Sequence, residues 1–171
     1  MKKENIIAII STIAIISTVS YSVLNIYAAD NLKFRWNPDE EFSFFALSKG
    51  QLEICNGFPF PVTFRGYSIE LTYDVTKIGT FSIGSVTVQP FSSSLINGKL
   101  ETESEIGLTY LLYLDSKLSG TNVARINVNN LNVVTSIQTS FLGVIPYSIS
   151  KEYTGYEFAD LMNTKDINFG C

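Results

Sequence analysis

The feature that constrains this chain most is an uncharged apolar run near its N-terminus. Residues 6–29 contain no Asp, Glu, Lys or Arg, and Lys2 and Lys3 precede them. In an α-helix these roughly 24 residues reach about 36 Å, enough to cross a hydrocarbon core of about 30 Å. The run therefore predicts a signal-anchor or transmembrane helix over residues 1–29, followed by a separate domain over residues 30–171.

A cleaved signal peptide is the alternative interpretation of the same run. Its apolar core would be Ile6–Ile16, and Ala28 and Ala29 are the small residues at which a peptidase would cut. The position three residues before such a cut holds Ile26 or Tyr27, where a small residue is preferred, and this favours an uncleaved anchor. We expect a single-pass protein of the cell membrane with an extracytoplasmic C-terminal domain. Secretion after cleavage is the alternative.

The charge balance and the absence of histidine exclude several classes of function. Removing Lys2, Lys3 and Glu4 from the totals of 12 basic and 16 acidic residues leaves a net charge of −5. Such a domain lacks the basic surface that neutralises phosphates, so we expect no nucleic-acid partner. Without histidine the chain lacks the usual general base near neutral pH and the commonest metal ligand. We expect a non-enzymatic protein with no catalytic residues, no cofactor and no metal site.

Apolar residues in the domain recur with a period of two. The clearest strand is 67–73, in which Tyr67, Ile69, Leu71 and Tyr73 alternate with polar residues. The alternation changes parity at Gly84-Ser85, where we expect a bulge or a tight turn. We also expect Gly143 to break a later strand, and residues 42–45 to form the first strand, with a helix starting at Asn37 as the alternative. Six to eight short strands of this kind predict a mainly β fold.

One segment has helical spacing instead. Leu108, Leu111, Leu112 and Leu118 recur every three or four residues, after a capping-box pair of Thr102 and Glu105 and before Gly120. This pattern predicts one short helix crossing the sheets. We expect a further short helix in the tail, over residues 155–163.

The order of these segments resembles the late-embryogenesis-abundant type 2 family, also called the water-stress and hypersensitive-response domain. The segments that carry the likeness are 52–62 (Leu-Glu-Ile-Cys-Asn-Gly-Phe-Pro-Phe-Pro-Val), 67–73, the hairpin around Gly79 and Gly84, and 141–146 (Phe-Leu-Gly-Val-Ile-Pro). The likeness covers residues 45–150. It implies a fibronectin/immunoglobulin-like β-sandwich that serves as a stress-associated or membrane-tethered binding module. The chain departs from the family where Gly57, not proline, follows Asn56.

The two cysteines, Cys55 and Cys171, are candidates for a disulfide. In an extracytoplasmic domain, two and only two cysteines suggest one bond, which here ties the C-terminus to the strand before Asn56. The alternative is a buried Cys55 that acts as a small apolar residue, with a free thiol at Cys171.

Two polar clusters each have a structural interpretation as well as a functional one. Glu101, Glu103 and Glu105 would place three carboxylates on one strand face, but same-face positions lie about 7 Å apart, too far for one Ca²⁺. A solvated face that resists aggregation is the better interpretation. The run of Asn127, Asn129, Asn130 and Asn132 would suit a sugar, but an exposed strand face containing a turn is the better interpretation.

These observations leave three hypotheses about function. The first is a membrane-anchored module with a structural, protective or partner-binding role, its partner being a surface protein or a glycan. The second is a pilin- or archaellin-like filament subunit, although Lys3 is followed by Glu4 and not by the small residue of a prepilin site. The third, and weakest, is a hydrolase that uses a pair of carboxylates.

Overall fold

The computed structural model describes residues 3–102, 105–120, 127–164 and 169–171. Its helical elements are α1 (Lys3–Asp30), η1 (Phe45–Lys49), α2 (Glu105–Leu118), η2 (Val128–Asn130) and α3 (Gly155–Met162). Its strands are β1 (Lys33–Trp36), β2 (Gln51–Asn56), β3 (Val62–Phe64), β4 (Gly66–Tyr73), β5 (Thr76–Ile83), β6 (Val86–Val88), β7 (Ser92–Asn97), β8 (Lys99–Thr102), β9 (Leu131–Phe141) and β10 (Ile145–Thr154). The fold is mainly β and starts with an apolar helix, as the sequence predicts.

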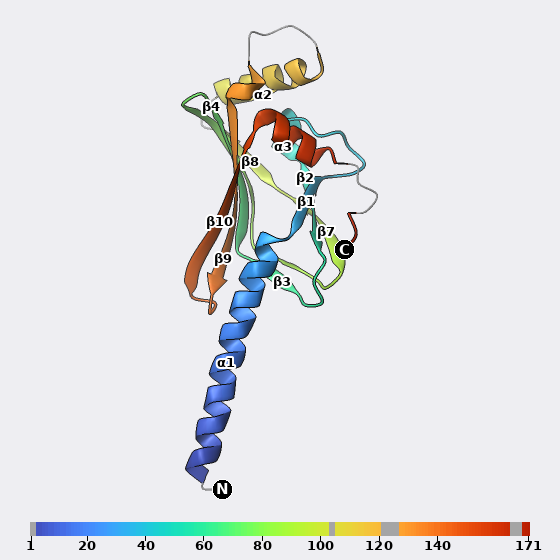
Figure 1. Cartoon of the computed structure of the whole chain (residues 1–171). Coiled ribbons are helices and arrows are strands. Elements are labelled where there is room, and N and C mark those ends of the chain that lie inside the picture. Colours follow the sequence, from blue (N-terminus) through green and yellow to red (C-terminus); the bar gives the residue numbers. More distant parts are fainter. Residues whose placement is uncertain (1–2, 103–104, 121–126, 165–168) are drawn as a thin grey trace.

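The strands form two main layers. The larger sheet has the order β10-β9-β4-β5-β8, the smaller has the order β1-β2-β7, and β3 and β6 form a separate pair. Every pairing is antiparallel. Figure 1 shows the larger sheet on one side of the domain and β1, β2 and β7 on the other.

One apolar core fills the space between these layers. Buried side chains alternate along β4 and β9, with Ile69 and Leu71 on the first strand and Val133 on the second. The rings of Phe34 in β1 and Tyr67 in β4 stack with their centroids 4.4 Å apart, which joins the two layers directly. The period-two pattern of 67–73 thus becomes β4, and the prediction of a strand there is confirmed.

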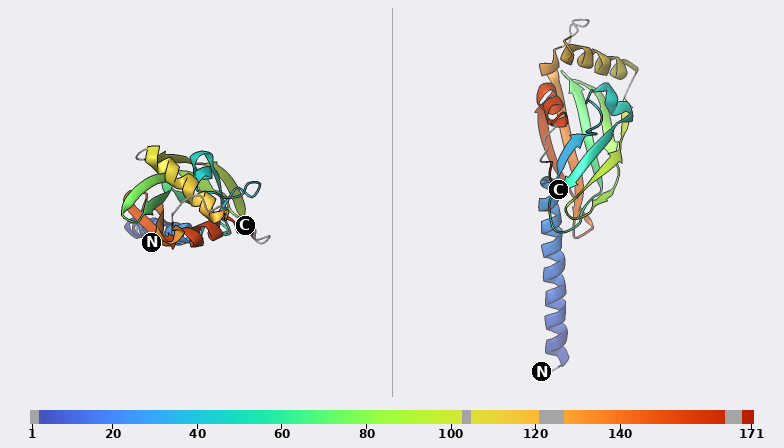
Figure 2. Two further views of the ribbon diagram at one scale, coloured as in Figure 1. Left: turned by 90° about the horizontal axis from the view of Figure 1, so that it is seen from above. Right: turned by 90° about the vertical axis from the view of Figure 1, so that its right-hand side faces the viewer.

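Two further helices, α2 and α3, accompany the sheets. α2 lies at the end of the domain opposite α1 (Figures 1 and 2). Gly107 lets α2 lie close to β5, because a Cβ there would be 2.6 Å from the carbonyl oxygen of Ile78. α3 begins with a capping box in which Thr154 and Glu157 satisfy each other's backbone N–H groups. The crossing helix expected over 108–118 is α2, and the further short helix expected over 155–163 is α3.

The expectation of a first strand over 42–45 is wrong. The first strand is β1, and the chain then turns through 37–40 and enters η1 at Phe45. Phe42 and Phe44 are buried and pack edge to face, with ring centroids 5.3 Å apart. Their burial comes from an aromatic cluster with Trp36 and Phe158, not from strand pairing.

The parity change at Gly84-Ser85 has a different cause from the one expected. β5 ends at Ile83 in the larger sheet, and β6 then pairs with β3 in the separate two-stranded sheet. The chain changes sheets at this point, so there is no bulge at Gly84-Ser85. The break at Gly143 is the turn of the β9–β10 hairpin, as predicted.

α1 projects from one end of the domain (Figures 1 and 2). Within the described chain it is long and apolar enough to cross a membrane, with a mean hydropathy of 2.1 over its most apolar window. Isoleucine side chains between residues 6 and 16 are about half exposed, and nothing in the domain covers them.

Candidate functional site

The C-terminal turns of α1 belong to the folded domain. Ser22, Asn25, Ala28 and Ala29 are buried there, and their spacing of three or four residues places them on one face of the helix. Between them, Tyr27 points away from this face and is exposed. The helix that the sequence divides from the domain at residue 29 therefore contributes to the domain core.

Asn25 forms the centre of this junction. Its amide nitrogen donates to the carbonyl oxygen of Thr63 at 2.9 Å and to Oγ1 of Thr139 at 3.2 Å. Its amide oxygen accepts the backbone N–H of Thr63, also at 2.9 Å. One side chain thus satisfies both backbone groups of a residue in β3, as a neighbouring strand would.

Two further polar contacts fix the helix against the β9–β10 hairpin. The hydroxyl oxygen of Ser22 accepts the backbone N–H of Leu142 at 3.1 Å. At the end of the helix, Nζ of Lys151 lies 3.0 Å from a carboxylate oxygen of Asp30 and donates to its backbone carbonyl at 2.9 Å. Sequence reasoning missed this junction, although Ser22 and Asn25, two polar residues three apart in an apolar run, are the signal for it.

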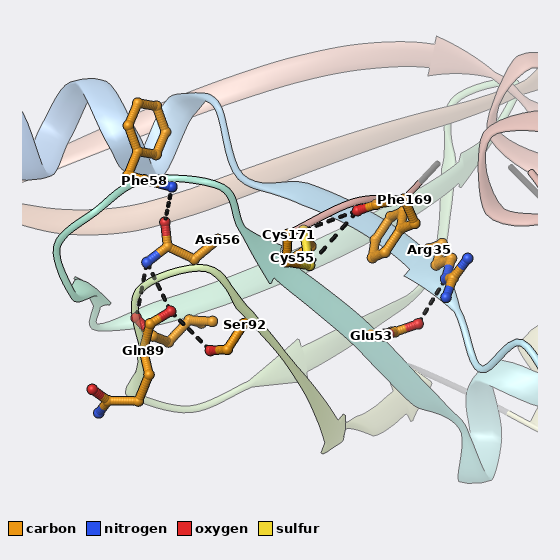
Figure 3. Close-up of a disulfide and its surroundings, with 10 residues drawn as sticks. Arg35, Glu53, Cys55, Asn56, Phe58, Gln89, Ser92, Phe169 and Cys171 are labelled. Carbon is orange, nitrogen blue, oxygen red and sulfur yellow. Dashed lines mark hydrogen bonds and ion pairs between the residues drawn. A yellow bond between two sulfur atoms is a disulfide. The ribbon is translucent and has the colours of Figure 1, made fainter. Parts of the chain in front are cut away.

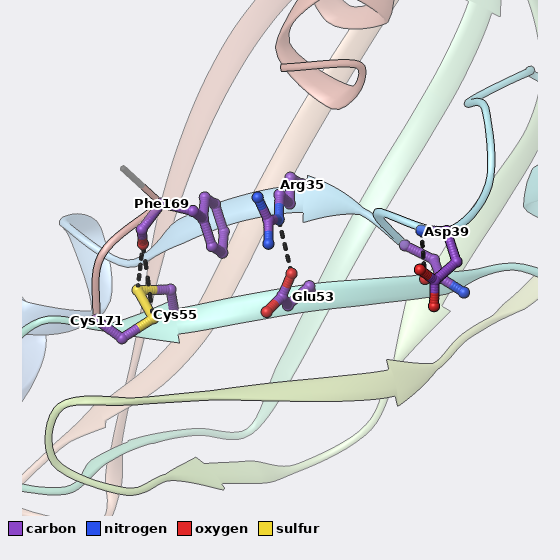
Figure 4. A network of polar contacts seen from close by, with 7 residues as sticks. Arg35, Asp39, Glu53, Cys55, Phe169 and Cys171 are labelled. Carbon is purple, nitrogen blue, oxygen red and sulfur yellow. Dashed lines mark hydrogen bonds and ion pairs between the residues drawn. A yellow bond between two sulfur atoms is a disulfide. The ribbon is translucent and has the colours of Figure 1, made fainter. Parts of the chain in front are cut away.

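The C-terminal tail is fastened to β2. The structure joins Cys55 and Cys171 in a disulfide, across a sequence separation of 116 residues. This is the pairing that the sequence favoured over a free terminal thiol. Figures 3 and 4 show Phe169 beside the disulfide, with its carbonyl oxygen 3.1 Å from Sγ of Cys55.

A charged pair lies beneath this tail. The Arg35 guanidinium is 4.1 Å from the ring centroid of Phe169 and 2.6 Å from a carboxylate oxygen of Glu53 (Figure 4). Burial alone would raise the pKa of the Glu53 carboxyl, but hydrogen bonds from Ser93 and Arg35, with the charge of Arg35, outweigh it and lower that pKa. Glu53 is therefore an ionised partner of Arg35 and is not poised to act as a proton donor.

Two grooves flank the tail, and Arg35 and Phe169 line both of them. The first, which we call the polar groove, has a volume of about 590 Å³. Its lining includes Asn37, Glu40 and Ser93. The second, which we call the apolar groove, has a volume of about 370 Å³. Its lining is defined by Phe34, Tyr67, Ile137, Tyr153, Leu161 and Phe169, with Lys33, Arg35 and Lys151 among the other residues.

Two tyrosines, Tyr67 and Tyr153, line the apolar groove, and Tyr67 is buried. Burial, with a smaller contribution from Tyr153, raises the pKa of Tyr67 well above its usual value, although a hydrogen bond with Thr135 opposes the shift. Tyr67 stays protonated over the physiological range. The apolar groove can bind an apolar group with an acidic end through its aromatic walls and cations.

Asn56, the residue on which the family resemblance depends, has a structural role. Its amide donates to the carbonyl oxygens of Phe60, Val88 and Gln89, and its side-chain oxygen accepts the N–H of Phe58 at 2.9 Å (Figure 3). This side chain is completely buried. It holds the turn between β2 and β3 in place without the proline that the family has after this asparagine.

The acidic cluster is not brought together among the described residues, whereas the asparagine cluster lines a shallow pocket of about 350 Å³. Glu101 is exposed and pairs with Lys99 at 2.9 Å. Glu103 lies outside the described residues, and Glu105 starts α2. The described part of the chain holds no group of three potential metal ligands. Asn129 and Asn130 lie in the η2 turn and Asn132 follows on β9, which agrees with a strand face that contains a turn, and the Asn130 amide donates to Asp74 at 2.7 Å.

The half-buried carboxylate of Asp115, in α2, accepts hydrogen bonds from backbone N–H groups. Burial raises the pKa of Asp115, while hydrogen bonds from Phe45, Phe44 and Ser43 lower it and reduce the shift. Its two oxygens accept the N–H groups of Phe44 and Phe45 at 2.6 and 2.8 Å. Asp115 thus ties the aromatic segment before η1 to α2, which is a structural role.

Comparison with known proteins gives no family. No family model matches the chain, and no curated protein matches it. A solved structure described only as a protein from Archaeoglobus fulgidus aligns with 13% identity over 72% of this chain and 94% of its own, with a TM-score of 0.29.

Proposed function

We propose that this chain is a non-enzymatic, membrane-anchored module whose β-sandwich is held outside the cytoplasm, at a fixed orientation, by an uncleaved α1. The fold is proposed to be of the fibronectin/immunoglobulin-like, late-embryogenesis-abundant type 2 kind. The observation that carries the proposal is the junction, in which one face of α1 completes the domain core while the preceding half of the helix exposes apolar side chains.

Cleavage after Ala29 would damage the domain that it releases. It would remove the fully buried side chains of Ala28 and Ala29 together with the Asn25 amide. The backbone N–H and carbonyl of Thr63 would lose their hydrogen bonds to the Asn25 amide. The junction therefore favours a chain that keeps its first 29 residues.

The disulfide supports an extracytoplasmic position for the domain. Structural disulfides persist in oxidising compartments and are rare in the cytosol. Lys2 and Lys3 before the apolar run favour an N-terminus on the cytoplasmic side, in agreement with that position.

For the binding role, the apolar groove is the favoured surface. Phe34, Ile137 and Tyr153 offer apolar contact, and Lys33 supplies a cation beside it, while Lys151 pairs with Asp30. These residues suit an apolar segment of a surface protein with acidic residues next to it.

The experiment is intact-mass analysis of the native protein from separated membrane and soluble fractions, alkylated with and without prior reduction. We expect a chain that retains residues 1–29, sediments with membranes after alkaline washing and takes up label at Cys55 and Cys171 only after reduction. A chain that begins near residue 30 in the soluble fraction would reject the anchor, and labelling without reduction would reject the extracytoplasmic position.

A filament subunit is the second candidate. The specific observation that favours it is the continuity of α1, whose free apolar half and docked end form one unbroken helix over Lys3–Asp30. The same mass analysis separates the two candidates, because a filament subunit of the pilin type would be cut near residue 4 and recovered in polymers.

A further inference from the structure

The β9–β10 turn is the most apolar exposed tip of the domain and lies beside α1. Residues 141–147, Phe-Leu-Gly-Val-Ile-Pro-Tyr, contain no charge. Val144 is 74% exposed and Ile145 is 53% exposed, so the tip presents large apolar side chains that nothing in the described chain covers. In Figure 1 this turn reaches down along α1, beyond the end of the helix that enters the domain.

The backbone of the turn is unusual for a tip that faces water. Leu142 and Gly143 have φ values of 53° and 72°, and the N–H of Val144 donates to the carbonyl of Phe141 at 3.2 Å. Three residues, Leu142 to Val144, separate the paired Phe141 and Ile145, and positive φ values in such a turn favour Gly, Asn or Asp. Here a leucine occupies the strained first position, so an apolar side chain is displayed where a polar one is usual.

The length of α1 determines how deep this tip would lie in a bilayer that the helix spans. The free helix from Ile6 to Tyr21, before the first contact with the domain at Ser22, is about 16 residues or roughly 24 Å long. A hydrocarbon core of about 30 Å needs about 20 helical residues, which carries its boundary to about Asn25. A tilted helix would need more residues still.

Ser22 ties the hairpin to this part of the helix. Its hydroxyl accepts the N–H of Leu142 at 3.1 Å, so the turn lies at the level of Ser22, about one helical turn inside the boundary near Asn25. The junction with Asn25 prevents the domain from lifting away along the helix. A membrane that accommodates α1 therefore meets the tip as well.

A second apolar surface, formed by Phe58 and Phe91, lies next to α1 at the level of the lipid headgroups. Phe58 packs edge to face on Tyr27 of α1, with ring centroids 5.9 Å apart, and Figure 3 shows it beside the helix. The N–H of Phe91 donates to the carbonyl of Phe58 at 3.2 Å, and the Phe91 ring is 60% exposed. Aromatic residues are favoured at this depth of a bilayer.

A cation accompanies the tip. The Arg65 guanidinium donates to the carbonyl of Gly143, and the residue itself is exposed. An arginine in this place reaches lipid phosphates with its guanidinium while its stem covers apolar surface.

We propose that the β9–β10 tip, Leu142 to Ile145, inserts into the outer leaflet of the same bilayer that holds α1, as a second membrane contact that fixes the tilt of the domain. This inference rests on the proposed anchoring of α1. The partner is the lipid itself: acyl chains for Val144 and Ile145, and phosphates for Arg65.

The test uses the full chain in phospholipid vesicles and two single substitutions, Val144→Trp at the tip and Val75→Trp as the matched control. Val75 is 95% exposed in the β4–β5 turn, and the antiparallel pairing of β4 with β9 places that turn at the far end of the domain. Both sites tolerate tryptophan because neither side chain is packed. The native Trp36 is buried in both variants, and the unsubstituted chain supplies its emission as a baseline.

We expect lipids brominated near the headgroup end of the acyl chains to quench Val144→Trp strongly, with blue-shifted emission, and to leave Val75→Trp at the baseline. Equal, weak quenching of the two variants on a chain that still floats with the vesicles would overturn the inference and leave the anchor intact. A chain that fails to float with the vesicles would overturn the anchor and the inference together. Ile145→Trp repeats the test at the adjacent position.

Discussion

The side-chain amide of Asn25 forms two hydrogen bonds of 2.9 Å with the backbone of Thr63, one to its carbonyl oxygen and one from its N–H. Thr63 is the middle residue of β3, a strand that pairs only with β6 among the described strands. The amide therefore occupies the place of a further strand at an exposed sheet edge. Through this pair, a helix with the composition of a membrane anchor becomes an integral element of the domain.

Replacing Asn25 with alanine should loosen the joint between helix and domain. The change removes the two hydrogen bonds between the buried Asn25 side chain and the backbone of Thr63, and we expect a loss of about 1–3 kcal/mol in the free energy of unfolding. Urea denaturation of the full chain in detergent micelles measures this loss. Proteolysis within 26–32 should accelerate in the same variant, because this segment is protected by packing against the domain.

Asn31→Ala is the matched control for this experiment. The Asn31 amide donates only to the carbonyl of Tyr27 on its own helix and is exposed. We expect its effect to stay within about 0.5 kcal/mol, as for other surface substitutions. Equal effects of the two substitutions would show that the Asn25 junction does not hold the domain.

Removing the disulfide should destabilise the domain more than any single hydrogen bond. For a loop closed across 116 residues the chain-entropy estimate is about 4–5 kcal/mol, so we expect Cys171→Ser to lower stability by several kcal/mol. Adding reductant should lower the melting temperature of the native chain and leave that of Cys171→Ser unchanged. If the reductant leaves the native chain unaffected, the tail is held by Phe169 and its neighbours alone.

The parts of the fold that sequence reasoning predicted are those in which local pattern and final environment agree. The alternation over 67–73 survives in β4 because one face of that strand is buried and the other is not. The helical spacing of Leu108 to Leu118 predicts the helix α2, although its buried face holds Leu111 and Leu114 while Leu108 and Leu112 are exposed. In both cases periodicity alone carries the information.

The remainder depends on contacts between distant residues, which periodicity does not record. Phe42 and Phe44 need no strand partner, because the side chains of Asn163 and Asp115 accept their backbone N–H groups. The apolar groove joins Phe34, Ile137 and Leu161, which come from three separate segments. The side-chain contacts of Asn56 with Phe58 and Phe60 hold the turn after β2 in the same way.

Gly98 should be intolerant of any side chain. A Cβ at this position would lie 1.9 Å from Cζ of Phe81, a ring that is completely buried between the sheets. Gly98→Ala must therefore displace the ring, and we expect a cost of about 1–3 kcal/mol, the usual range for overpacking. Gly84→Ala is the control, because a Cβ there meets nothing within 4 Å. Thermal unfolding that ranks the two variants in the opposite order would contradict this packing.

The ion pair of Arg35 and Glu53 should make the stability of the domain depend on pH in the acid range. The native pKa of Glu53 lies below its ordinary value of 4.5, so the unfolded chain takes up the proton first as the pH falls. The contribution of Glu53 is present above pH 4.5 and is lost as the pH falls through its lowered native pKa. Glu53→Gln should therefore be less stable than the native chain at neutral pH, and the difference should shrink in acid.

Glu101→Gln separates this effect from that of an exposed pair. Glu101 also has a lowered pKa, because of a hydrogen bond and the charge of Lys99, but its side chain is 69% exposed. Water screens such a pair, so we expect the stability of Glu101→Gln to follow that of the native chain at every pH. Urea denaturation between pH 3 and pH 7 measures both variants. A Glu53→Gln curve parallel to the native one would mean that Arg35 holds Phe169 and the tail without help from the Glu53 charge.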